Sequence, residues 1–169
     1  MQQPPPLRTG EQKPPAPPPP PPVRGPPAPP PTPSLDAARR AIEAVKAALP
    51  YMTLGPPLLH PGPGGIHVDV PLMYQGFALD RIHYDPVSGE PRPKGMPVHA
   101  PGLPEGFRVR DFLRELCVVE AVEYREPERA WIVPLRWRVY IVAHVRVSED
   151  GSELIPDYPL TEEVMRRVV

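Results

Sequence analysis

Two pairs of residues in this chain have the types and the spacing of metal ligands, His67-x-Asp69 and His83-x-Asp85. Side chains alternate along a β-strand, so each histidine shares a face with its own aspartate if both segments are strands. Imidazole nitrogens and carboxylate oxygens are ligands that zinc, iron and manganese take in proteins. The pattern therefore predicts a candidate metal site at these four residues, for which the cofactor would be a divalent transition metal.

The register between the two strands decides whether the pairs meet. In an antiparallel pair, the residue numbers of any two partners add to a constant. The apolar residues of the two strands share one face only if this sum is even, and the two even registers considered have sums of 150 and 152. The first register sets His67 opposite His83, and the second sets Asp69 opposite His83 and His67 opposite Asp85. A minimal two-residue turn at Gln75-Gly76 gives an odd sum and would separate the pairs. In an even register without metal, the residues would form a ladder of cross-strand His–Asp hydrogen bonds on a solvated face.

A second group of residues alternates along the segment Ala130–Val147 and would line one face of a long strand. These residues are Arg136, Arg138, Tyr140, His144 and Arg146. Arginines interleaved with an aromatic side chain can contact phosphates and stack on bases. Salt bridges to nearby glutamates explain the same pattern, and the sequence after the first 33 residues is slightly acidic. Nucleic-acid binding is therefore the weaker interpretation of this group.

The remaining reactive residues give weaker signals. His60 and His99 lie in segments rich in proline and glycine, where either could supply an additional ligand. Cys117 lies between apolar residues, which predicts a buried and unreactive thiol. No Gly-x-Ser-x-Gly or His-Glu-x-x-His motif occurs, and we therefore favour a protein that is not an enzyme.

The candidate ligands need a sheet to hold them, and the sequence predicts one. Ile66–Leu72 and Phe77–Asp85 alternate as two strands joined by a turn. The other predicted elements are a helix from Leu35 to Pro50 capped by Ser34, a helix at Phe107–Leu116, strands at Val118–Arg125, Ala130–Val147 and Ser152–Ile155, and a final helix capped by Thr161 in which Leu160 packs on Met165. We expect an α+β fold, with a mostly antiparallel sheet and helices packed on one face.

Two apolar patterns define the expected core, and one segment lies outside it. The stripe of the first helix consists of Leu35, Ala38, Ile42, Val45 and Leu49. The long strand should bury the face opposite its arginines, formed by Trp137, Val139, Ile141, Ala143, Val145 and Val147. Residues 86–106 form a long loop rich in proline and glycine, and loops of that length are usually functional.

The domain organisation follows from the distribution of proline. Residues 1–33 hold 17 of the 33 prolines and few large apolar residues. Such a composition predicts a disordered tail with polyproline II character, followed by one domain at residues 34–169. The Pro-x-x-Pro spacings of the tail could dock in an aromatic-lined groove of a partner, while a plain tether explains the same composition.

Charge and composition restrict the function. The formal net charge of −1 lacks the basic footprint of a dedicated nucleic-acid-binding protein, and the single cysteine excludes an intrachain disulfide. No apolar run is long enough to span a membrane, so we expect a cytoplasmic protein. We favour a non-catalytic binding or accessory module that its tail recruits to a protein partner in a larger assembly. The alternatives are a metal-dependent protein or enzyme centred on the His/Asp pairs, and a binder of RNA or single-stranded DNA.

Overall fold

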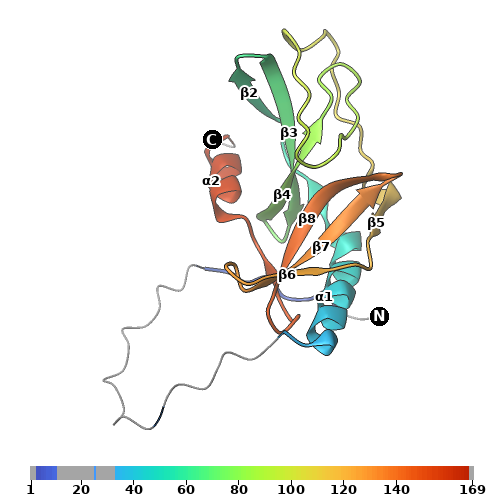
Figure 1. Ribbon diagram of the computed structural model, residues 1–169. Coiled ribbons are helices and arrows are strands. Elements are labelled where there is room, and N and C mark those ends of the chain that lie inside the picture. Colours follow the sequence, from blue (N-terminus) through green and yellow to red (C-terminus); the bar gives the residue numbers. More distant parts are fainter. Residues whose placement is uncertain (1–2, 11–24, 26–32, 168–169) are drawn as a thin grey trace.

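The strands and helices of this chain form two antiparallel sheets, each with one α-helix packed on it (Figure 1). The computed structural model describes residues 3–10, 25 and 33–167. It confirms the predicted α+β class with antiparallel strands. The strands are divided between two sheets, however, and the helices do not lie together on one face of a single sheet.

The first sheet carries the candidate ligands. Its strands are β1 (Thr53–Leu54), β2 (Leu58–Gly62), β3 (Gly65–Tyr74) and β4 (Phe77–Tyr84). The long strand β3 is central, because it pairs with β4 along one edge and with β2 and β1 along the other. The sequence predicted only β3 and β4 and left residues 51–65 as a connection. Proline and glycine concealed the short strands there.

The hairpin of β3 and β4 contains both an odd and an even register. At the turn Gln75-Gly76 both residues have positive φ, 49° and 83°, as a two-residue hairpin turn of this kind requires. The register beside the turn is therefore odd. A β-bulge between Leu72 and Met73 shifts it by one residue, so that Asp69 pairs with His83 in the even register with a sum of 152.

This bulge buries the apolar side of both strands and directs their polar side to the opposite face. The core residues that the two strands contribute beyond the bulge are all 0% exposed, and they are Val68, Val70, Leu72, Ile82 and Tyr84. Asp69 and His83 alternate with these residues and therefore lie on the other face of the sheet. The helix α2 (Tyr158–Arg167) packs beside that face, against β4.

The second sheet corrects the prediction of one long strand at Ala130–Val147. Its strands are β5 (Leu116–Val118), β6 (Glu123–Arg125), β7 (Ala130–Trp137), β8 (Tyr140–Ser148) and β9 (Leu154–Ile155). β7 and β8 form a hairpin whose turn is Arg138-Val139, with Arg138 at a φ of 54°. Neither residue is typical of such a turn, so the sequence concealed it. β5 and β6 likewise replace the single strand predicted at residues 118–125.

The hairpin changes which residues of this segment form the core. Trp137, Ala143, Val145 and Val147 are buried as predicted. Val139 and Ile141 were expected in the core, but they lie at the hairpin tip and are 87% and 40% exposed. The prediction for these two residues was wrong because the chain turns at Arg138-Val139. Val139 lies in the turn, and Ile141 pairs with Arg136 on the returning strand.

The segment before β5 also differs from the prediction. Phe107–Leu116 was expected to be a helix, yet only a 3-10 turn, η2 (Leu113–Glu115), forms there. Phe112 is buried as expected and packs edge-on against Tyr84 and Trp137, with ring centroids 5.8 and 5.9 Å away. Cys117 is exposed, so the expectation of a buried thiol was wrong.

The helix α1 (Leu35–Ala48) packs on the second sheet. Its predicted cap is confirmed, because the Ser34 hydroxyl accepts a hydrogen bond of 3.0 Å from the Ala37 amide. A 3-10 turn, η1 (Leu49–Tyr51), follows. The buried stripe consists mainly of alanines, whereas Leu35, expected in the core, is 68% exposed. Small side chains suit this face because Gly151 approaches the helix so closely that a Cβ there would lie 2.6 Å from the Ala37 carbonyl oxygen.

The N-terminal residues 3–10 pack against the domain, which the expectation of a free tail did not include. The Arg8 amide donates to the Leu154 carbonyl at 3.0 Å, and Leu7 is only 6% exposed. The Tyr74 hydroxyl donates to the Pro5 carbonyl at 2.5 Å. Of the rest of the predicted tail, only residues 25 and 33 are described, and the remainder lies outside the described residues.

α2 begins earlier than the sequence predicted. The Asp157 carboxylate caps it by accepting from the Leu160 amide at 3.0 Å, whereas Thr161, the predicted cap, lies inside the helix. Met165, predicted to pack on Leu160, is 60% exposed. A small apolar cluster of Leu58, Ala78, Leu160 and Val164 attaches the helix to the first sheet. Neither α-helix of the described chain has the length and apolar composition needed to cross a membrane.

Candidate metal centre

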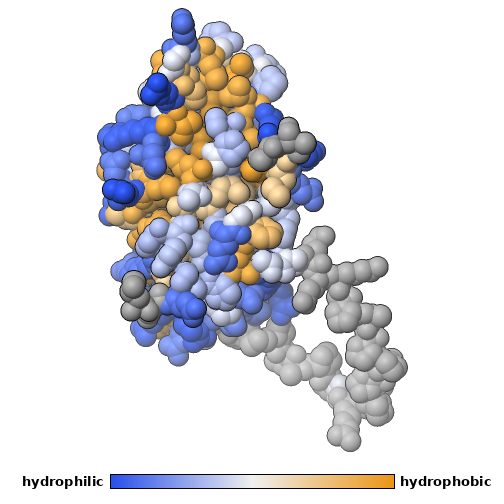
Figure 2. Space-filling view, turned by 180° about the vertical axis from the view of Figure 1, so that it is seen from behind, coloured by the Kyte–Doolittle hydropathy of each residue, from blue (hydrophilic) through white to orange (hydrophobic). Residues whose placement is uncertain are grey.

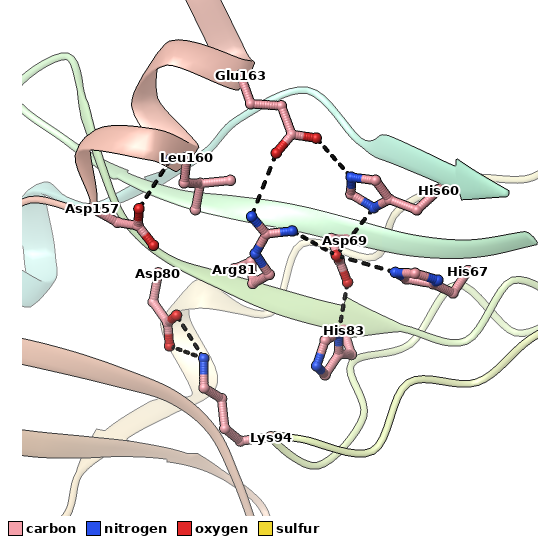
Figure 3. Close-up of polar contacts among 10 residues, drawn as sticks. All are labelled: His60, His67, Asp69, Asp80, Arg81, His83, Lys94, Asp157, Leu160 and Glu163. Carbon is pink, nitrogen blue, oxygen red and sulfur yellow. Dashed lines mark hydrogen bonds and ion pairs between the residues drawn. The ribbon is translucent and has the colours of Figure 1, made fainter. Parts of the chain in front are cut away.

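Asp69 is the centre of a polar cluster on the α2 side of the first sheet (Figure 3). Its side chain is 1% exposed although it lies in the middle of β3. The oxygen Oδ1 accepts a hydrogen bond of 2.6 Å from Nδ1 of His83 on β4. The other oxygen, Oδ2, faces His60 Nδ1 at 3.2 Å, His67 Nε2 at 3.5 Å and Arg81 Nη1 at 3.2 Å. Two imidazoles and a guanidinium thus converge on one buried carboxylate oxygen.

His60 is held from behind by the second helix. It lies on β2 and pairs in register with His67 across the β2–β3 hairpin, which places the ring centroids 5.0 Å apart. Its Nε2 is 2.6 Å from the Glu163 carboxylate on α2. A carboxylate accepts hydrogen bonds, so Nε2 carries a proton that it donates to Glu163, and Nδ1 is the ring nitrogen that faces Asp69. Nδ1 is buried and has no hydrogen-bond partner among the described residues.

His67 lies between the other histidines. The ring centroid of His99 is 5.1 Å away and that of His83 is 6.4 Å away. Burial lowers the pKa of His67, the Asp69 charge opposes this, and His60, His99 and His83 add to the lowering. Its imidazole is therefore neutral at neutral pH, the form that binds a metal.

The charge of Asp69 persists despite its burial. Burial by itself would raise the pKa of this carboxyl, but the His83 hydrogen bond and the nearby His67 and Arg81 together bring the pKa below its ordinary value. Arg81 also lies 3.4 Å from Glu163, whose pKa is likewise low: burial would raise it, and His60 and Arg81 oppose that effect. Both carboxylates are therefore ionised at neutral pH.

Three of the four predicted ligands come together, and the fourth does not. His67, Asp69 and His83 share the cluster, in the register with a sum of 152. That register would bring Asp85 opposite His67, but β4 ends at Tyr84. The Asp85 carboxylate instead accepts from the amides of Val87 and Ser88, at 2.8 and 3.2 Å, and shapes the start of the 86–106 loop.

Sequence reasoning gave His60 little weight and missed Arg81 and Glu163. His60 could have been found, because the two-residue turn Pro63-Gly64 sets it opposite His67. Arg81 shares a face with His83 by strand alternation. Glu163 gave no such signal, since it meets the cluster only through the packing of α2 on β4.

The arginine-rich group does not form one continuous face. Arg138 stacks over Trp137, with the guanidinium carbon 4.1 Å from the ring centroid. Arg136 donates to the Arg138 carbonyl at 3.0 Å, and Tyr140 starts β8 with 39% exposure. These three residues therefore gather at the hairpin tip.

His144 and Arg146 lie farther along β8. The pKa of His144 is lowered, first by burial and then by Lys94. Arg146 donates to the Pro156 carbonyl at 2.9 Å and lies 3.8 Å from Glu128. This last contact is a salt bridge of the kind that the alternative interpretation of the group expected.

Comparison with known proteins adds no relative. No protein-family model, no curated protein and no solved structure matches this chain. The function must therefore be argued from the geometry of the cluster itself.

Proposed function

We propose that this protein binds a divalent transition metal, with zinc as the best fit, through His60, His67 and Asp69. The observation that carries the proposal is the convergence of two imidazole nitrogens on the buried oxygen Asp69 Oδ2, at 3.2 and 3.5 Å. One ligand atom from each of the three residues lies within 4.8 Å of the others.

The electrostatics of His60 call for a cation beside it. Glu163 engages Nε2 of His60, and Nδ1 lies 3.2 Å from an ionised carboxylate oxygen of Asp69. Two acceptors at that distance repel each other unless a proton or a metal ion lies between them. The contact does not have hydrogen-bond geometry, because Nδ1 has no hydrogen-bond partner in the described chain. A hydrogen bond requires the proton to lie close to the line that joins Nδ1 and Oδ2. A metal ion can bind both atoms from one side of that line.

Two of the three spacings between ligand atoms match tetrahedral zinc. Zinc–nitrogen bonds of about 2.0–2.1 Å and zinc–oxygen bonds of about 2.0–2.2 Å imply tetrahedral ligand-to-ligand distances of about 3.3–3.5 Å. The distances from Asp69 Oδ2 to His60 and His67 are 3.2 and 3.5 Å. Asp69 is therefore spaced from each histidine as two ligands of one zinc ion are, and the two histidine ligand atoms lie within 4.8 Å of each other.

The outer contacts have the organisation of a metal site. Histidine ligands commonly bond a carboxylate through their second ring nitrogen, which fixes the tautomer and raises the basicity of the ligand. Glu163 does this for His60 at 2.6 Å. His83 orients the ligand carboxylate through Oδ1, and Arg81 bridges Asp69 and Glu163. Since the three ligands come from β2 and β3 and the outer carboxylate from α2, the metal would stabilise the packing of these elements.

Metal titration with matched variants tests the proposal. Purified protein, stripped with chelator and titrated with zinc in a calorimeter, should bind one ion per chain. His60→Ala should abolish binding, while His144→Ala, a histidine of the other sheet, should leave it unchanged. Glu163→Gln should weaken affinity by roughly 10–100-fold, the usual cost of an outer-shell change. Equal binding by wild type and His60→Ala would overturn the assignment.

A role as an accessory module in a larger assembly is a second proposal, and the exposed apolar side chains favour it. Val139, Tyr140 and Ile141 are consecutive and exposed at the β7–β8 tip. The Lys94 amide bonds the Ile141 carbonyl, and Met96, two residues along the loop from Lys94, is 64% exposed. Hydrophobic residues also gather over the upper part of the back of the molecule (Figure 2). Contiguous exposed apolar residues often mark protein interfaces. A partner recovered with wild type but lost with Val139→Asp would support this proposal, and recovery of the same partner with both proteins would refute it for the tip.

Two further expectations stay proposals. Cytoplasmic location agrees with the single, exposed Cys117, which requires no oxidising compartment. Nucleic-acid binding would have to use the tip residues Arg136, Arg138 and Tyr140 alone, because His144 and Arg146 lie farther along β8. Filter binding of single-stranded RNA by wild type and Arg136→Ala would test it.

A further inference from the structure

We propose that His99 supplies the fourth ligand of the metal site and that the metal thereby fastens the 86–106 loop to the first sheet. This inference rests on the metal binding proposed above. His60, His67 and Asp69 occupy three positions, and structural zinc sites take four protein ligands, whereas catalytic sites keep one position for water. A fourth histidine would make the site structural, in agreement with a non-catalytic role.

Four of the five histidines of this chain gather here, and two of them remain as candidates for the fourth position. His83 bonds Asp69 Oδ1 through Nδ1 at 2.6 Å, and its ring centroid is 6.4 Å from that of His67. His99 is closer to His67, at 5.1 Å, and its side chain is exposed. His99 is therefore the candidate nearer to His67, and its exposed side chain leaves room for a change of rotamer.

The backbone beside His99 is fixed against the sheet. Ala100 and Ile66 exchange two backbone hydrogen bonds, of 2.9 and 2.7 Å. Gly65 permits this approach, because it has a φ of +106° and a Cβ there would lie 2.2 Å from the Ala100 carbonyl oxygen. The Cα of His99 is thus held one residue from an anchored position. Rotation about the side-chain torsions can then bring an imidazole nitrogen toward the ligands without movement of the loop backbone.

A salt bridge holds the first half of the loop, whereas the second half is attached through the Ala100 backbone and the partly buried Leu103. Lys94 fastens the first half, with Nζ 2.6 Å from the Asp80 carboxylate and its amide donating to the Ile141 carbonyl at 2.8 Å. In residues 95–106, Ala100 is the one buried residue. A metal–His99 bond would add a second strong attachment to this half, and the loop would then be ordered in proportion to metal occupancy.

Cobalt(II) reports the exchange of a fourth protein ligand for water, because the position and intensity of its visible absorption depend on both the identity and the number of its ligands. Wild-type protein loaded with cobalt should give the intense tetrahedral spectrum. His99→Ala should still bind cobalt, with the spectrum weakened and shifted as water enters and with affinity reduced on the order of tenfold or more. His144→Ala should match wild type. An unchanged spectrum and affinity in His99→Ala would overturn the assignment of His99 while leaving the three-ligand site intact.

Hydrogen exchange measures the consequence for the loop. Zinc should slow amide exchange across residues 95–106 in wild type, and this protection should disappear in His99→Ala even at zinc concentrations that saturate the variant. Slowing of exchange that persists in zinc-saturated His99→Ala would refute the fastening role. Failure of wild type itself to bind zinc or cobalt would instead refute the proposed function, so the two failures are distinguishable.

Discussion

The two long hairpins of this protein are built alike and end with opposite surfaces. β3–β4 and β7–β8 each turn on two residues and each contain a β-bulge, at Leu72/Met73 and at Leu135/Arg136. In the first hairpin the bulge places Asp69, 1% exposed, inside a cluster of histidines. In the second, the turn presents Val139 to solvent with 87% exposure.

The difference arises from what packs beside each hairpin. β2 and α2 lie beside β3 and β4 and contribute His60 and Glu163, so polar side chains converge and are buried. At the β7–β8 tip, β5 pairs with β7 as far as Trp137, but the arginines of the tip bond a backbone carbonyl or stack on Trp137. Alternation along a strand therefore places residues on one face, but a third element is needed to bring them together as a site.

The largest expected effect is the loss of the buried charge at the centre of the cluster. Asp69→Asn should lower the free energy of unfolding by about 3–5 kcal/mol in metal-free buffer, because it leaves Arg81 and His83 without their buried partner. Asp85→Asn should cost less than about 1 kcal/mol, since an amide oxygen can still accept the two loop amides. Urea unfolding of both variants measures the difference. Equal costs would mean that the cluster is no more organised than a surface turn.

The second prediction compares two apolar residues of the β7–β8 hairpin. Leu135 is 0% exposed and Ile141 is 40% exposed. Leu135→Ala should cost about 2–5 kcal/mol, as cavity-forming substitutions do. Ile141→Ala should cost under about 1 kcal/mol, because the residue already contacts water. Chemical unfolding again provides the values, and a large cost for Ile141→Ala would restore the continuous strand that the sequence suggested.

A matched pair of arginines compares the two hairpins directly. Arg81→Ala should cost about 1.5–3 kcal/mol, because Arg81 bonds both Asp69 and Glu163 beside a buried carboxylate. Arg138→Ala should cost about 0.5–1 kcal/mol, the usual value of an exposed stacking contact with an aromatic ring. Thermal unfolding of the two variants at one pH would show the order. The reverse order would contradict the account of the cluster.

The smallest expected effect is a dependence on pH. The folded-state pKa of Asp69 lies below its ordinary value, so its ionised form stabilises the fold above pH of about 4 and this contribution is lost as the pH falls through the folded pKa. The lowered pKa of His67 acts in the same direction near pH 6.5, since protonation favours the unfolded chain. The stability difference between wild type and Asp69→Asn, followed by urea unfolding in chelator, should therefore shrink below pH 4. A constant difference down to pH 2 would show that Asp69 is not ionised in the fold.

The sequence supplied the local part of this structure and missed the part that depends on packing. The apolar alternation of 66–72 and 77–85 gave the two strands and the shared face of His67, Asp69 and His83. The bulge could not be predicted, because the two-residue turn requires an odd register and the apolar residues require an even one. Each requirement is met in its own part of the hairpin, and only the structure shows where the register changes. Turns without glycine or asparagine, as at Arg138-Val139, were also invisible, and this hid the second hairpin.

The most direct test of the central claim is a crystal structure of the protein with zinc, with data collected on both sides of the zinc absorption edge. We expect one strong anomalous peak per chain, about 2.0–2.2 Å from His60 Nδ1, His67 Nε2 and Asp69 Oδ2. The absence of a peak there in zinc-saturated crystals would contradict it. A proton between His60 and Asp69 would then replace the metal ion, and His60, Asp69 and Glu163 would form a structural hydrogen-bond network.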